Sequence, residues 1–353
     1  MLLRLGRAAL LAGLLFLPDP LHAADAPAAD EGQTLDVRRL SPEQRRRLLA
    51  GDTISYPVAE TSETELGAGV AMYLPVPLAR VAEVLTSADV VLKDPSITAS
   101  GLIPPGATPD MLTGFKLGSS ELAEAQEVLD AAPGSRFNLT PSEIDAFRAA
   151  KASLRGGDRT LTLDVAAAGW RALLIQRAQA LQTRGLDGVL PYARRNGVSD
   201  PAALLRVAAG DARIVAHLAP RLSEELLRYP AEQSPTAVSQ LYWVKRQVQG
   251  RSTPILIHHL IDVRPGLALY VERQVYVAHT YNASQILCAA VPFEDGVLIV
   301  SSNRVSTDAV AGLGSEMKHA IGRRQLRAEI VKRFDRIRAA FARPAPPVHV
   351  ESP

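Results

Sequence analysis

The feature that most constrains the fold is a series of strand patterns in the second half of the chain. Five consecutive segments between residues 241 and 305 are apolar runs of strand length, and the gaps carry turn residues such as Gly250, Pro265-Gly266 and Asp295-Gly296. Strands joined by short turns of this kind pair antiparallel. One segment, residues 267–281, is longer than a usual strand of about 3 to 10 residues, so we expect a bend or bulge within it.

A long helix is predicted directly after the meander. Residues 315–342 carry an interrupted apolar stripe that includes Ile330 and Phe334, which is typical of a helix packed on one side. Earlier in the chain, residues 67–74 alternate like a strand and residues 77–86 read as a helix. An antiparallel sheet with helices packed on it is an α+β architecture. We therefore expect α+β topology, with a curved antiparallel sheet that grips its long C-terminal helix around an apolar space.

The middle of the chain predicts a large helical insertion. Thr140-Pro141-Ser142-Glu143 is a capping box, and apolar residues around Trp170 recur at helical spacing. Another capping box, Ser41-Pro42-Glu43-Gln44, starts an early helix that Gly51 ends. The domain organisation follows as a signal peptide (1–23), a disordered linker (24–38), an α+β domain (39–109 and 239–343), a helical insertion (110–238) and a disordered tail (344–353).

The first residues indicate export. Arg4 and Arg7 precede an apolar run, residues 8–17, and small residues follow it. This order is typical of a secretory signal, and the run is shorter than the about 20 apolar residues that span a bilayer. We expect cleavage near Ala23 or Ala26 and a periplasmic or secreted protein.

Composition excludes several classes of function. The formal net charge is only +2, so the sequence predicts no nucleic-acid partner. Cys288 is the single cysteine, which rules out an internal disulfide and a cysteine-rich metal site. No His-Glu-x-x-His or Gly-x-Ser-x-Gly motif occurs, and Gly312-Leu313-Gly314 lacks the third glycine of a dinucleotide fingerprint. We therefore expect no metal, no cofactor and no motif-borne catalytic residue.

The order of elements resembles the START-like helix-grip superfamily, which contains lipid-transfer, polyketide-cyclase and hydrophobic-ligand proteins. The resemblance covers residues 67–86 and 239–342, and the helical residues 110–238 depart from it. It implies a ligand cavity between the sheet and the last helix. Two stretches, residues 272–282 and 302–324, are also similar to a family of exported bacterial proteins with no assigned activity, which implies export and no chemistry.

Arg273 is the most unusual residue of the predicted strands. Alternation places it on one apolar face with residues such as Leu269 and Val277, and continues that face to His279 and Tyr281. An unpaired buried charge is costly. Arg273 therefore anchors an acidic or phosphate head group of a ligand, forms an internal pair with a carboxylate such as that of Asp262, or is exposed past a bulge.

Two histidines are further candidates. His259 shares a strand face with Ile257 and Ile261, so it can point into the cavity, where it could form a metal or acid–base pair with His279. Because neither histidine belongs to a recognised motif, both can equally be core or surface residues.

The sequence thus predicts an exported protein that binds a hydrophobic or lipid-like ligand in a helix-grip cavity. The alternatives are a cyclase- or hydrolase-like enzyme of the same fold and a non-enzymatic module of the cell envelope. The basic helix 316–343 could contact an anionic membrane peripherally, or could simply be a solvated outer face. The residues expected to line the ligand site are Trp243, His259, Arg273, His279 and Tyr281.

Overall fold

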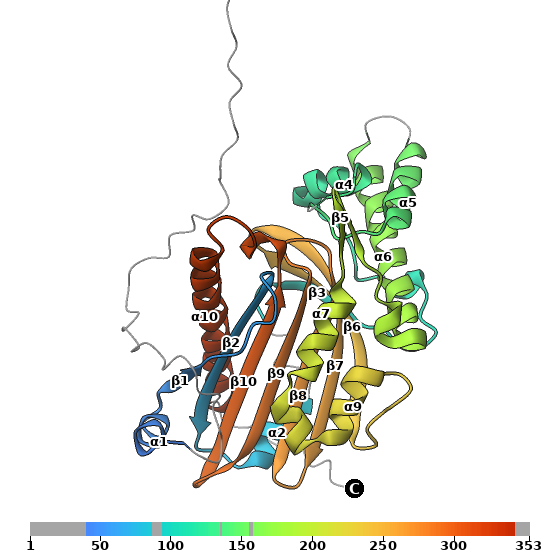
Figure 1. Ribbon diagram of the computed structural model, residues 1–353. Helices are drawn as coiled ribbons and strands as arrows, with labels where there is room; N and C mark the ends of the chain where they lie inside the picture. Colours follow the sequence, from blue (N-terminus) through green and yellow to red (C-terminus); the bar gives the residue numbers. More distant parts are fainter. Residues whose placement is uncertain (1–39, 87–93, 135, 155–157, 343–353) are drawn as a thin grey trace, which may run out of the picture.

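The computed structural model describes residues 40–86, 94–134, 136–154 and 158–342 (Figure 1). The predicted signal peptide (1–23), the linker (24–38) and the tail (344–353) lie outside the described residues. The predictions about these three segments therefore stay predictions.

An antiparallel sheet of eight strands forms the centre of the molecule, in the order β1-β2-β10-β9-β8-β7-β6-β3. Its last five strands in sequence are the predicted meander, and Gly250 and Gly266 adopt φ +76° and +80° in the turns. The short edge strand β1 was not predicted. The strands are β1 (Thr53–Tyr56), β2 (Glu65–Leu74), β3 (Ile97–Leu102), β6 (Ala237–Val248), β7 (Arg251–Arg264), β8 (Leu267–Val277), β9 (Ala283–Phe293) and β10 (Gly296–Ser306).

Helices cover both faces of the sheet (Figure 1). The long helix α10 (Ser315–Ala342) and the short helix α2 (Leu78–Thr86) pack on one face. The opposite face carries three short helices from the predicted insertion, α7 (Pro201–Gly210), α8 (Arg213–Leu218) and α9 (Pro220–Arg228). The predicted α+β fold, with a long C-terminal helix against an antiparallel sheet, is confirmed.

Two features hold α10 against the sheet. Ile330, Phe334 and Ile337 are buried in one apolar cluster with side chains of β2, β8 and β10. Gly322 allows a close approach at β2, since a Cβ atom there would lie 2.6 Å from a methyl carbon of Leu66. The later part of the predicted apolar stripe, from Ile330 onward, thus faces the sheet, whereas its first residues, Met317 and Ile321, are 67% and 38% exposed.

The remaining helices occupy the two ends of the sheet. Helix α1 (Pro42–Leu49) begins with the predicted capping box at Ser41 and buries Leu48 against β1 and β2. Beyond the other end lie α4 (Leu122–Leu129), α5 (Pro141–Ala152), α6 (Arg159–Arg184) and the small hairpin of β4 (Tyr192–Arg194) and β5 (Gly197–Ser199).

The predicted insertion shares cores with the sheet. Trp170 of α6 lies 6.5 Å from Tyr276 of β8, and Phe115 lies 5.5 Å from Trp243 of β6, measured between ring centroids. Together with α7–α9, which pack on β7, β8 and β9, these contacts make residues 110–238 part of the packing that positions the strands.

A bulge in β8 changes which residues share a face. Ile257 of β7 pairs with Gln274, but the neighbouring Leu256 pairs with Tyr276, so Val275 has no opposite residue. The expected bend in this segment is confirmed. The expected common face from residue 267 to residue 281 is wrong, because an extra residue reverses the alternation: Leu269 packs under α7–α9, whereas Val277 belongs to the opposite face.

Candidate functional site

A network of polar side chains crosses the sheet beneath α10. The hydroxyl of Tyr270 donates to a carboxylate oxygen of Glu272 at 2.8 Å and lies 3.0 Å from Nε2 of His259. The amide of Gln274 donates to the other oxygen of Glu272 at 2.6 Å, and its own oxygen accepts from the hydroxyl of Tyr281. Cross-strand pairing of β7 with β8 places His259 and Glu272 opposite each other, which brings the network onto one face.

The network stabilises a buried carboxylate anion at Glu272. Burial alone would raise the pKa of this group, but His259, the positive charge of Arg333 and the hydrogen bond from Gln274 outweigh burial and hold the pKa well below its usual range. Burial and the nearby Glu272 raise the pKa of Tyr270 far above its usual value. A general acid or base works best with a pKa near the working pH, so these shifts suit binding better than proton transfer.

A hollow lies between this network and the two helices that cover it, and we call it the α10 hollow. Its volume is about 40 Å³, which is room for about three water molecules. A larger ligand therefore fits only if α2 or α10 moves away from the sheet. The hollow is lined by Leu85, Asp94, Ile97, Val244, Arg246, Ile255, Ile257, Tyr270, Glu272, Gln274, Cys288, Arg333, Arg336 and Ile337.

Three arginines of the lining differ in their partners. One oxygen of Asp94 accepts from Arg246 at 3.1 Å and from Arg336 of α10 at 3.3 Å. Arg333, one helical turn before Arg336, makes no hydrogen bond or ion pair with any residue that the structure describes. The α10 hollow thus combines apolar side chains with one cation that is free to meet an anion.

None of the five predicted site residues lines the α10 hollow. His259 and Tyr281 come nearest, because they bond to the lining residues Tyr270 and Gln274. Trp243 is buried on the other face of β6, where its ring packs on Phe115. The cause is strand alternation, which turns Trp243 away from its neighbour Val244, a lining residue.

Arg273 lies on the opposite face of the sheet from the α10 hollow. It is completely buried under α7–α9, between its cross-strand neighbours His258 and Gln285. Neither Nε nor Nη2 has a hydrogen-bond partner among the described residues, and the proposed partner Asp262 instead pairs with Arg264 at 3.0 Å. Burial lowers the pKa of Arg273 to about 10, so the side chain remains a cation at neutral pH.

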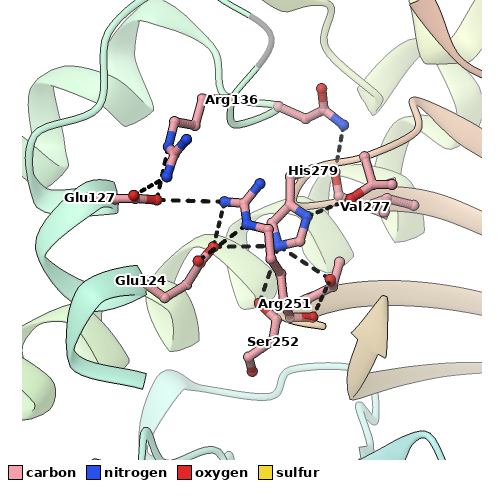
Figure 2. Close-up of polar contacts among 10 residues, drawn as sticks. Glu124, Glu127, Arg136, Arg251, Ser252, Val277 and His279 are labelled. Carbon is pink, nitrogen blue, oxygen red and sulfur yellow. Dashed lines mark hydrogen bonds and ion pairs between the residues drawn. The ribbon is translucent and has the colours of Figure 1, made fainter. Parts of the chain in front are cut away.

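His279 belongs to a different cluster, at the contact between the sheet and α4 (Figure 2). Its Nε2 lies 3.2 Å from both the hydroxyl of Thr253 and the carbonyl oxygen of Ser252, and 3.4 Å from Glu124. Arg251 binds the same carboxylate at 2.7 Å. His279 is completely buried, so the cluster joins α4 to the sheet and presents no reactive group to a substrate.

The predicted pairing of the two histidines is therefore wrong. His259 lies in the network beneath α10, whereas His279 lies beneath α4 beside Phe137. No group of three metal-ligating side chains occurs in the described part of the chain. Burial raises the pKa of Cys288 to about 12, which keeps this thiol protonated and unreactive.

The most informative residues of the site were missed by sequence reasoning. Arg333 was counted only as one of many basic residues on the last helix, and Tyr270 and Glu272 were not considered. A signal was available: on β8 these two polar residues alternate with apolar ones, at the face opposite to Arg273. The sequence does not show which face of β8 the last helix covers. It therefore could not decide whether the face with Arg273 or the face with Tyr270 and Glu272 forms the site.

Comparisons with known proteins give no assignment, since no protein-family model, no curated protein and no solved structure matches the chain. The START-like relationship therefore stays a prediction. Within the described ranges, no helix is long and apolar enough to cross a membrane.

Proposed function

We propose that this chain is an exported protein that binds a small amphipathic molecule of the hydrophobic or lipid-like class in the α10 hollow. The observation that carries the proposal is the hollow itself, an apolar space between the sheet and the C-terminal helix with converging polar groups on its floor. Ligand sites commonly combine an apolar lining with a few placed polar groups. The START-like resemblance supports the same location.

The chemistry of the floor favours binding over acid–base catalysis. Tyr270 is held in its neutral form and Glu272 in its ionised form, each by a pKa moved away from neutrality. Both are consequently fixed hydrogen-bonding groups near pH 7. Such groups orient the polar end of a ligand, because their charges do not change when the ligand arrives.

The proposal is tested with a larger side chain on the sheet that fills the α10 hollow. Purified protein, freed of bound lipid, is titrated with saturated fatty acids of increasing chain length by calorimetry and native mass spectrometry. We expect saturable binding of one molecule and its loss in Ile257→Phe, since Ile257 lines the hollow. The control is Val263→Phe, on the same strand but 39% exposed.

Two outcomes would decide against a binding protein. One is the absence of saturable binding at every chain length; the other is unchanged binding in an Ile257→Phe protein that melts like wild type. Hydrogen exchange adds an independent readout, because a ligand larger than the present hollow must alter the protection of α2 or α10.

We also propose a second, peripheral role for the start of α10 at an anionic membrane surface. Most basic residues of this helix bind partners within the chain, but Arg324 is exposed, and Leu313, Met317 and Ile321 are 98%, 67% and 38% exposed. Exposed apolar side chains beside a cation suit a charged lipid surface. Met317→Asp should abolish co-sedimentation with phosphatidylglycerol vesicles; wild-type protein that fails to co-sediment would exclude this role.

A further inference from the structure

We infer that the molecule bound in the α10 hollow carries one negative charge, a carboxylate held by Arg333; this inference rests on the proposed function. The basis is the balance of charge around the hollow and the bonding of each charged group. A carboxylate, a phosphate and a neutral hydroxyl are the three head groups to be distinguished.

The charged groups of the lining do not balance. Among the residues that the structure describes, three guanidinium groups, from Arg246, Arg333 and Arg336, face two carboxylates, from Asp94 and Glu272. The described part of the lining therefore carries one positive charge in excess. In a partly buried site such an excess is costly unless an anion compensates it, and a single negative charge is sufficient.

Both carboxylates are already bound by other residues. One oxygen of Asp94 accepts from the backbone and hydroxyl of Ser96, and the other accepts from Arg246 and Arg336. Glu272 is bound by Tyr270 and Gln274. Neither carboxylate bonds to Arg333, so this is the guanidinium of the lining that has no hydrogen-bonded partner among the described residues.

Arg333 is well placed to hold a head group while the rest of a ligand enters the apolar part of the hollow. It extends from the same helix as Ile337, and the aliphatic side chains of Ile255 and Ile257 form the facing wall on the sheet. A planar guanidinium binds a carboxylate through two parallel hydrogen bonds. The positive charge of Arg333 also helps to lower the pKa of Glu272.

A doubly charged phosphate fits this balance less well. It would turn an excess of one positive charge into an excess of one negative charge, close to the buried anion of Glu272. A neutral head group would leave the excess positive charge of the described lining uncompensated. The charge count therefore selects a monoanion, and the guanidinium geometry selects a carboxylate.

The test compares four probes with the same eight-carbon chain. Octanoate, octyl phosphate, 1-octanol and octylamine are titrated into the full protein at pH 8, where the phosphate is doubly charged because its second pKa is about 6. We expect octanoate to bind best. A charge-assisted hydrogen bond contributes about 1.5–3 kcal/mol, so Arg333→Gln should weaken octanoate roughly 10- to 100-fold and leave 1-octanol unchanged.

The matched control is Lys332→Gln, which removes one positive charge from a position of the same helix that is 64% exposed and should not change binding. If octyl phosphate, 1-octanol or octylamine binds best, or if Arg333→Gln and Lys332→Gln behave alike, the inference is wrong while the binding function stands. If none of the four probes binds, and longer fatty acids also fail, the proposed function itself is wrong.

Discussion

Protonation of His279 should destabilise the protein in mildly acidic solution. This histidine is completely buried between β7, the end of β8 and α4 (Figure 2). The pKa of His279 is lowered from 6.5 to about 4, mainly by burial and next by the positive charge of Arg251. Glu124 lies 3.4 Å away and would favour the charged imidazole, but Arg251 binds and neutralises that carboxylate. Arg136 and Glu127 form the outer pair of the cluster.

The magnitude follows from the two pKa values. Between pH 6.5 and pH 4 the unfolded chain binds a proton at His279 that the folded chain does not, so acid favours unfolding. Each pKa unit corresponds to 1.36 kcal/mol, so His279 should remove about 3 kcal/mol of stability between pH 7 and pH 4. Above pH 6.5 both states carry a neutral imidazole, and this contribution is constant. The pKa of His258 is also lowered by burial, and its effect has the same sign.

The assay is urea unfolding at pH 7, 6, 5 and 4, followed by the fluorescence of the buried Trp170 and Trp243. In His279→Gln the loss of stability on acidification should be about 3 kcal/mol smaller than in wild type, even if the variant is less stable at pH 7. Exposed His217 provides the control, since His217→Gln should keep the wild-type slope. Equal slopes in His279→Gln and wild type, or a measured pKa of His279 near 6.5, would refute the reasoning.

Two further predictions concern the two faces of the sheet. Phe334→Ala should lower the free energy of unfolding by about 3–5 kcal/mol, the usual loss for a buried phenylalanine, because this ring of α10 is 0% exposed. Chemical denaturation should show a smaller loss for Phe341→Ala, since Phe341 is half-buried. Equal losses in the two variants would contradict the packing. Arg273→Met should leave stability unchanged or raise it by about 1–4 kcal/mol, since replacing an unpaired buried charge by an apolar side chain is often favourable. A loss of more than about 2 kcal/mol would contradict this prediction and would show that the charge of Arg273 is compensated, by the buried Glu225 of α9 or by bound water.

The sequence by itself determined the fold class and most of the secondary structure, although not the short strand β1. Turn residues such as Gly250 and Gly266 separate the strands, and the capping boxes at Ser41 and Thr140 start helices α1 and α5 where expected. These signals are local, because they depend on backbone conformation and on side chains three or four residues apart. These signals can therefore be recognised without knowledge of the rest of the molecule.

The tertiary structure decided which of these residues form the candidate site. Alternation along β8 places Arg273 and Glu272 on opposite faces of the sheet but does not reveal which face α10 covers. A single extra residue at Val275 then reverses the alternation before His279. Asp94 is 239 positions before Arg333 in sequence, and of the two lining arginines on α10 it binds Arg336 and not Arg333. The face that a residue occupies, the register of its strand and its long-range partners are properties of the packed chain. Each depends on which distant elements bury their apolar surfaces against one another.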